Sequence, residues 1–297
     1  MISGLLKRLK YGAPKVPLVL EPELPEPTLW APVSQGCTQG QMEEAHYARW
    51  CHEIREAPRM HRKQWEFCFI LQALEAADML RDGRSALGFG VGMEPLPAVF
   101  AKNGVEVLAT DLDMVQAQGK GWIETAQHAR STLDLNDRAI CDQAQFDALV
   151  SFRDMDMNHI DPALYGKFDF CWSACAFEHL GSIAHGLDFV INSVKCLKPG
   201  GVAVHTTEFN CSSNSDTLDN ASTVLFRKRD FVLLAQRLEK MGCEMEFNFN
   251  LGEQPLDLFI DTPPYSVDDH LKLQIQKWTV TSFGLIIHKP EAVDLDA

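Results

Sequence analysis

The stretch that decides the fold is Ala86-Leu87-Gly88-Phe89-Gly90-Val91-Gly92-Met93-Glu94, followed by Val105-Glu106-Val107-Leu108-Ala109-Thr110-Asp111. Its order predicts a strand, a glycine-rich turn, a helix, a second strand and an acid. Glycines at alternate positions let the backbone turn sharply and approach a ligand where a Cβ would clash. An acid about 20 residues further on is placed to bind ribose hydroxyls. The stretch therefore predicts a site for a nucleoside cofactor.

Strands and helices alternate regularly from this stretch onward. We expect strands at residues 85–89, 105–110, 148–152, 168–172, 202–207, 244–249 and 279–288. We expect helices at residues 95–103, from 112 to about 129, at 183–197 and at 229–241, with Gly104 and Gly242 as C-cap residues. This alternation predicts an α/β fold: a Rossmann-like, doubly wound, mostly parallel seven-stranded sheet with helices on both faces.

Several polar or glycine-rich positions follow directly after predicted strands. They are Gly88–Gly92, Asp111, Asp154 and Ser173. In an open parallel sheet, ligands bind beyond the carboxyl ends of the strands at the switch point. We therefore expect these positions to meet in one crevice.

The N-terminal part of the chain has a different composition. Six prolines between residues 11 and 33 disfavour both helix and central strand. Helical patterns follow at residues 40–58 and 61–80. We expect residues 1–60 to form a proline-rich arm and cap helix, and residues 61–290 to form the main domain.

Composition narrows the functional class. The chain has 297 residues, 27 Lys+Arg against 41 Asp+Glu, and a formal net charge of -14, which disfavours nucleic acid as a partner. Nine scattered cysteines, an odd number without a C-x-x-C pair, indicate reduced thiols in a cytoplasmic protein without a clustered metal site. Apolar runs are too short for stable membrane insertion.

Two further motifs stand at expected strand boundaries. Phe168-Asp169-Phe170-Cys171-Trp172-Ser173-Ala174-Cys175-Ala176-Phe177-Glu178-His179-Leu180 covers the fourth strand, and Leu197-Lys198-Pro199-Gly200-Gly201 precedes the fifth. Together with the glycine stretch and Asp111, they resemble the class I S-adenosylmethionine-dependent methyltransferases over residues 60 to 290. The resemblance implies S-adenosylmethionine as cofactor and a Rossmann-like methyltransferase domain.

The resemblance also implies a set of cofactor contacts. It places the ribose on Asp111 and the adenine against Asp154, Met155 and Leu112, with further contacts from Gly88, Gly90, Gly92, Glu94 and Ser173. Two departures from the family pattern stand out, because Gly88 occupies a position where the family often has an acid, and Glu94 replaces the third glycine. Glu94 either supplies a substitute carboxylate for the cofactor's ammonium group or is a helix-start acid favoured by the helix dipole.

Glu178 and His179 are the expected catalytic residues. Histidine suits proton removal near neutral pH, so His179 is the candidate base, the alternative being a helix-start histidine bonded within the fold. His205 lies within a strand and is expected to be structural. The Glu178-His179 pair is also similar to the pattern of metal-dependent small-RNA 2′-O-methyltransferases, but Cys175 stands where an acidic ligand is expected, and we predict no metal.

The acceptor site is expected to come from segments outside the core pattern. The candidates are Gln41, Tyr47, Trp50, His61, Arg62, Trp65 and residues 261–265. The resulting hypothesis is O-methylation of a small molecule or glycan by in-line methyl transfer. The alternatives are a nicotinamide-dependent oxidoreductase and a catalytically inactive cofactor-binding or scaffold paralogue.

Overall fold

A mixed, mostly parallel sheet runs through the centre of the computed structural model, which describes residues 24–112, 132–265 and 269–291. Its strand order is β4-β3-β2-β5-β6-β10-β1-β7, with β8 and β9 joined to β10. The strands are β1 (Ser34–Gly36), β2 (Ser85–Phe89), β3 (Glu106–Asp111), β4 (Val150–Asp154), β5 (Phe168–Ala174), β6 (Leu197–Asn210), β7 (Phe247–Asn248), β8 (Ile260–Asp261), β9 (Lys272–Ile275) and β10 (Trp278–His288). The five strands from β4 to β6 are parallel, and β10 is antiparallel to β6.

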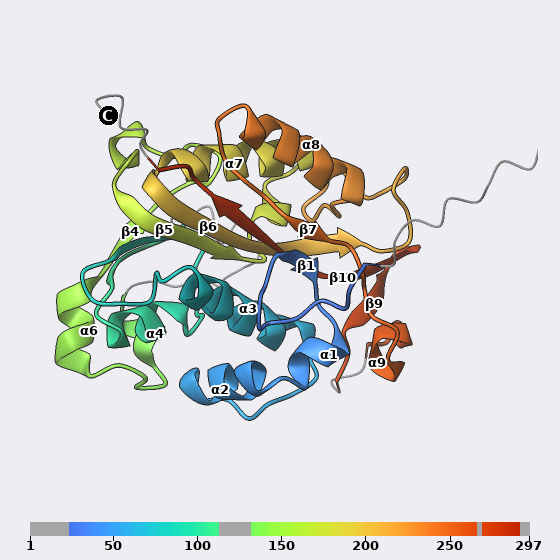
Figure 1. Cartoon of the computed structure of the whole chain (residues 1–297), viewed down its shortest axis with the longest axis horizontal. Helices are drawn as coiled ribbons and strands as arrows, with labels where there is room; N and C mark the ends of the chain where they lie inside the picture. The colour runs from blue at the N-terminus through green and yellow to red at the C-terminus, as the bar shows by residue number, and fades with distance from the viewer. Residues whose placement is uncertain (1–23, 113–131, 266–268, 292–297) are drawn as a thin grey trace, which may run out of the picture.

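Helices cover both faces of this sheet. Figure 1 shows α7 and α8 on one face and α3, α4 and α6 on the other, with α2 packed outside α3. The helices are α1 (Gln39–Met42), α2 (Ala45–Glu53), α3 (Arg62–Ala76), α4 (Leu96–Lys102), α6 (Gln143–Leu149), α7 (Ile183–Lys195), α8 (Lys228–Glu239) and α9 (Pro255–Leu258). Short 3-10 turns lie at Thr132–Asn136, Pro162–Leu164 and Phe177–His179.

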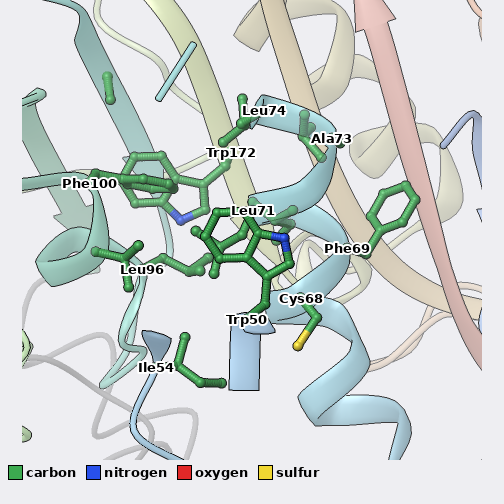
Figure 2. Close-up of a cluster of buried hydrophobic side chains, with 14 of the residues drawn as sticks. Trp50, Ile54, Cys68, Phe69, Leu71, Ala73, Leu74, Leu96, Phe100 and Trp172 are labelled. Atoms are coloured by element: carbon green, nitrogen blue, oxygen red, sulfur yellow. The ribbon is translucent and has the colours of Figure 1, made fainter. Parts of the chain in front are cut away.

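Two apolar layers hold the helices to the sheet. One layer packs α2, α3 and α4 against the sheet, and the other packs α7 and α8 against the opposite face. Figure 2 shows part of the first layer, where Trp172 of β5 meets Phe100 of α4 edge to face with ring centroids 4.8 Å apart. Leu71 and Leu74 of α3 complete this contact region. The first layer thus packs α3 against β5, β6 and β10.

Local sequence signals account for where several elements begin and end. The Ser182 hydroxyl accepts a hydrogen bond from the backbone N–H of His185 and caps the start of α7. Gly104 and Gly242 were predicted as C-cap residues, but the C-cap residues are Asn103 and Lys240. Both glycines lie just beyond these caps with φ of 79° and 76°, the left-handed conformation that commonly ends a helix. β2 is an unbroken apolar segment, as expected for a strand covered on both faces.

The predicted α/β architecture is confirmed, but the predicted number of seven strands is wrong. The sheet has ten strands, because the short segments β1, β8 and β9 add to the seven predicted ones. β6 begins at Leu197 rather than at residue 202, because Leu197 pairs with Phe168 of β5. It extends to Asn210, because its second half pairs with β10, whereas β7 is shorter than predicted. The helix predicted from residue 112 to 129 lies outside the described residues.

The N-terminal part of the chain contributes to the sheet. β1 pairs antiparallel with β10 on one side and parallel with β7 on the other. The division into residues 1–60 and 61–290 stays a prediction. Among the described residues no helix has the length and apolar character needed to cross a membrane.

Candidate active site

A cavity of about 590 Å³ opens at the carboxyl ends of the parallel strands, within the range of small-molecule sites. Its wall comes from the loop after β2, from the ends of β3, β5 and β6, and from the first turns of α3. The lining residues with polar or charged groups are Lys63, Glu66, Glu94, Asp111, Asp156, Cys175, His179, Glu208 and Thr223. The predicted crevice is therefore present, and it includes residues from the N-terminal side of the glycine stretch.

The glycine loop brings its backbone to the cavity. Gly90 and Gly92 have φ of 59° and 50°, a conformation that favours glycine. A Cβ at Gly90 would lie 2.9 Å from the Cβ of Ala176 on the opposite wall. The loop therefore needs glycine at position 90 both for its turn and for its close approach to the segment after β5.

Asp111 lies at the end of β3, where the sequence placed it. Its Oδ2 accepts a hydrogen bond from the backbone N–H of Gly92 at 3.1 Å, and its Oδ1 accepts from Leu112 at 2.8 Å. The carboxylate is thus oriented by the glycine loop and lines the cavity, as Leu112 and Met155 also do. An acid held in this way fits a pair of ribose hydroxyls.

Glu94 also reaches the cavity, but it already has a partner inside the fold. Its Oε1 accepts a hydrogen bond from Nε1 of Trp172. Burial raises the pKa of the Glu94 carboxyl well above its usual range; the Trp172 hydrogen bond opposes this, and Asp111 and Glu66 raise the pKa further. Glu66 of α3 lines the same cavity as Glu94 and the glycine loop.

Four predicted site residues do not line the cavity. Gly88 packs inside the sheet, where a Cβ would lie 2.4 Å from the Trp172 ring. Asp154 is exposed at the end of β4, and the neighbouring Asp156 lines the cavity instead. The Ser173 hydroxyl is bonded to Nδ1 of His205, and Glu178 is fully buried behind the wall. The roles of all four stay predictions.

His179 does line the cavity, and its ring is oriented by the polypeptide that precedes α8. Its Nδ1 lies 2.9 Å from the carbonyl oxygen of Ser222 and 3.2 Å from Oγ1 of Thr223. Because a carbonyl oxygen only accepts hydrogen bonds, Nδ1 carries the proton and the lone pair is on Nε2. The geometry therefore gives His179 the tautomer that a general base needs.

His205 has a different environment from His179. It is fully buried, with Nδ1 2.8 Å from the Ser173 hydroxyl and Nε2 3.0 Å from the Ser193 hydroxyl. Ser193 donates its own proton to the carbonyl of Val190, so Nε2 of His205 donates to Ser193. Burial lowers the pKa of His205 to about 3. His205 is a neutral core histidine, as its position within a strand suggested.

A group of interacting charges, here called the α3 cluster, forms the wall opposite the glycine loop. Its members are Arg62, Lys63, Glu66, Cys175, Glu208 and Ser282. Arg62 Nη1 binds both oxygens of Glu208, at 2.7 and 2.9 Å, and Lys63 Nζ lies 3.2 Å from Oε1 of both Glu66 and Glu208. Burial alone would raise the pKa of Glu208, but Arg62 and Lys63 lower it to about 2. Glu208 is therefore charged, and Arg62 and Lys63 compensate its charge.

Cys175, Glu178 and Glu208 come close enough to suggest a metal site, with one ligand atom of each lying within 4.8 Å of the others. Arg62 and Lys63, however, already pair with Glu208. Burial raises the pKa of the Cys175 thiol, and burial likewise raises that of Glu178, so both groups favour their protonated forms. The donor set is thus poorly matched to a cation, and Cys175 instead donates to Glu66.

The aromatic acceptor candidates of the N-terminal helices are part of the core. Trp65 donates through Nε1 to Gln41, and Trp50 donates through Nε1 to Gln72. Tyr47 is buried and donates to the carbonyl of Arg59. None of these aromatic residues lines the cavity. Three other residues of α3 line the cavity: Lys63, Glu66 and Phe67. The periodicity of the helix does not distinguish them from its other polar and apolar positions.

Comparison with known proteins gives the family. The family model for the methyltransferase domain matches residues 87–205, which include the glycine loop, Asp111 and His179. These residues form a methyltransferase domain of the class I S-adenosylmethionine-dependent type, with S-adenosylmethionine as its cofactor. A search of curated proteins gave no match.

Solved structures with a similar fold are distant in sequence. A protein described as a putative sarcosine dimethylglycine methyltransferase from Galdieria sulphuraria is 15% identical, with 89% of this chain and 94% of that chain covered and a TM-score of 0.48. A putative methyltransferase from Bacillus halodurans is 15% identical over 74% of this chain and 98% of its own, with a TM-score of 0.44. Phosphoethanolamine N-methyltransferase 2 from Haemonchus contortus is 16% identical, with 69% of this chain and 45% of that chain covered and a TM-score of 0.41.

Proposed function

We propose that this methyltransferase methylates an oxygen atom of a small molecule or glycan, with His179 as the general base. The observation that carries the proposal is the orientation of His179 in the cavity wall, with Nδ1 directed at the Ser222 carbonyl. An alcohol needs to lose a proton as it attacks, and an imidazole with its lone pair on Nε2 can accept that proton.

The cofactor supplies an activated methyl group on a sulfonium, so the protein needs no covalent intermediate. The task of this chain is to align the acceptor oxygen with that methyl group and to keep water away. The apolar lining residues Phe67, Val91, Met157, Leu180 and Ile275 suit the exclusion of water.

The binding site proposed for the cofactor consists of residues that line the cavity. Asp111 binds the ribose hydroxyls, and the backbone of Gly90 and Gly92 packs beside the cofactor. Leu112 and Met155 form apolar walls. Asp156 is a better candidate than Asp154 for a polar contact with the adenine, because Asp156 lines the cavity and Asp154 is exposed at the end of β4.

The charge of the cavity wall limits the acceptor class. Among the lining residues that the structure describes, Lys63 carries an ammonium group and five carry carboxyl groups: Glu66, Glu94, Asp111, Asp156 and Glu208. Such a wall repels polyanions, so the proposed acceptor is an uncharged hydroxylated molecule rather than a nucleic acid. The predicted cytoplasmic location is compatible with such an acceptor and is part of the proposal.

Glu178 is proposed to act behind the wall rather than on the acceptor. Its Oε2 accepts from the Thr207 hydroxyl at 3.1 Å, and it immediately precedes His179 in the 3-10 turn. Such a residue positions the turn that carries His179.

The experiment compares His179→Ala with the wild-type protein, using tritium-labelled S-adenosylmethionine and a pool of small hydroxylated molecules and oligosaccharides. We expect turnover to fall by roughly 10²- to 10⁴-fold, since the base is lost, while cofactor affinity is retained. His185→Ala is the matched control, because His185 lies in the next turn of the chain and is bonded to the Leu180 carbonyl.

Two results would reject the proposal. Full activity of His179→Ala would remove His179 as the base. Recovery of the label in methylamines or methyl thioethers, instead of methyl ethers or esters, would exclude oxygen as the acceptor atom. The absence of any cofactor-dependent transfer would favour the inactive paralogue.

A further inference from the structure

Glu66 is a buried carboxylate that uses only one of its two oxygens within the fold. Its exposed fraction is 2%, and it lines the cavity. Among the described residues, the contacts of Glu66 all go to Oε1: the Cys175 thiol donates to it at 3.0 Å, the Ser282 hydroxyl donates to it, and Lys63 Nζ lies 3.2 Å away. These groups fix the carboxylate and leave Oε2 as its acceptor toward the cavity.

Lys63 supplies the opposite charge one turn earlier on the same helix. Its side chain is 40% exposed, and it lines the cavity beside Glu66. The ammonium carries three N–H donors, of which one hydrogen bond goes to Oε1 of Glu208 at 3.2 Å. Lys63 and Glu66 therefore present a cation and an anion side by side to a ligand.

This pair matches one part of the cofactor. S-adenosylmethionine ends in an α-amino acid, whose ammonium and carboxylate form a zwitterion. A surface that offers a carboxylate and an ammonium 3.2 Å apart is complementary to such a group, since each charge meets the opposite one.

The position of Glu66 relative to the glycine loop supports the same match. Glu66 lines the same cavity as Gly90, Gly92 and Glu94 of the glycine loop. Glu94 has its Oε1 engaged by Trp172, and Gly88 stands where the family often has an acid. Glu66 is a further carboxyl group of the same wall that can accept a hydrogen bond from the cofactor's ammonium group.

We propose that Lys63 and Glu66 of α3 bind the amino-acid end of S-adenosylmethionine, with Glu66 Oε2 accepting from the ammonium and Lys63 pairing with the carboxylate. This inference rests on the cofactor seat proposed above. It makes α3, which precedes the matched methyltransferase domain, a part of the cofactor site.

The test uses two adenosyl thioethers that differ only in this end. S-adenosylhomocysteine carries the amino acid, whereas 5′-methylthioadenosine lacks it. Titration calorimetry of the full chain with each compound separates the two parts of the seat. We expect Glu66→Gln and Lys63→Met each to weaken S-adenosylhomocysteine by roughly 10- to 100-fold, the range for hydrogen bonds to charged groups, and to leave 5′-methylthioadenosine within about twofold.

Two controls make the result specific. Asp111→Ala should weaken both compounds together, because both contain the ribose. Glu53→Gln removes one partner of a surface ion pair with Lys102, 2.6 Å apart, and should change neither affinity. Retained binding of 5′-methylthioadenosine also shows that each α3 variant is folded. If Glu66→Gln does not fold, Lys63→Met alone tests the contact with the amino-acid end of the cofactor.

Unchanged affinity for S-adenosylhomocysteine in both α3 variants would overturn the proposal. An equal loss for both compounds would also overturn it, because the effect would then not be specific to the amino-acid end. If neither compound binds the wild-type protein, the cofactor seat itself is wrong. That outcome differs from failure of the α3 contact alone.

Discussion

The two walls of the cavity are built in different ways. The glycine loop and Asp111 lie within about twenty residues of one another, and their contacts run through backbone N–H groups. The α3 cluster joins Arg62 to Glu208 and to Ser282, which come from β6 and β10. One wall therefore depends on local backbone conformation, and the other on buried charges that only the complete fold brings together.

This difference indicates where the molecule is vulnerable. A glycine loop can be perturbed with limited loss of stability, because it is short and lies at a strand end. A buried ion pair costs much more when one partner is removed, since the other charge stays buried without compensation. We therefore expect the buried Arg62–Glu208 pair of the α3 cluster to govern folding. Cofactor affinity should depend on the loop and Asp111, together with Lys63 and Glu66, which line the cavity.

The largest expected effect is on stability, from Arg62→Ala. Removing the guanidinium leaves Glu208 charged and only 5% exposed, with Lys63 as its remaining cation. We expect the free energy of unfolding to fall by about 3–5 kcal/mol, measured by denaturant titration.

The double variant Arg62→Met, Glu208→Gln refines this test. With the buried charge removed as well, it should be more stable than Arg62→Met alone. If Arg62→Met and the double variant lose the same stability, the cluster does not act through compensated charge.

The next largest effect is on cofactor affinity, at the wall formed by the glycine loop and Asp111. Asp111→Ala should weaken S-adenosylmethionine binding by roughly 1–3 kcal/mol, the range for hydrogen bonds to a charged group, with little change in the unfolding midpoint. Calorimetry and thermal unfolding of the same sample check both parts. A variant that loses stability but keeps its affinity would reverse the assignment of the two walls.

The smallest effect concerns pH and His205, three residues before Glu208 on β6. The pKa of His205 is lowered to about 3 in the folded protein, against about 6.5 when unfolded. Between these values the unfolded chain binds a proton that the folded chain does not, so stability falls as the pH falls. From pH 7 to pH 5 this group alone should cost about 2 kcal/mol.

The measurement is the dependence of unfolding free energy on pH for the wild-type protein and His205→Gln. The variant should lose less stability over that interval. His288→Gln, which changes an exposed histidine, is the control and should keep the wild-type dependence. Identical curves for His205→Gln and wild type would show that His205 is not held neutral by its burial.

The sequence predicted the wall formed by the glycine loop and Asp111 better than it predicted the α3 cluster. Glycine spacing, an acid after a strand and alternation of strands and helices are local signals, so β2, Gly90 and Asp111 were found where expected. The position of Asp154 at the end of β4 predicts an adenine contact there, but it is Asp156, two residues further on, that lines the cavity. The path of the chain after a strand is not set by local pattern. Ser173 was chosen for its place after a strand, but its hydroxyl binds His205 inside the sheet.

The α3 cluster depends on pairs of residues that are far apart in the sequence, so no local pattern predicts them. Arg62 and Glu208 are 146 residues apart, and the register of β6 against β10 decides that Glu208 lies beside Ser282. Glu66 looked like an ordinary polar position of a helix. A carboxylate among Trp65, Phe67 and Phe69 was the available signal, since an acid in an apolar helical segment needs partners.

The pairing of β1 also has a consequence for synthesis on the ribosome. Residues 34–36 emerge early, whereas their partners in β7 and β10 extend to residue 288. Until those late segments appear, the early one has no hydrogen-bonding neighbours in the sheet, and β6 lacks its antiparallel partner. Nascent chains of this protein therefore expose unpaired backbone until β7 and β10 have been synthesised, and they need protection from association during that interval.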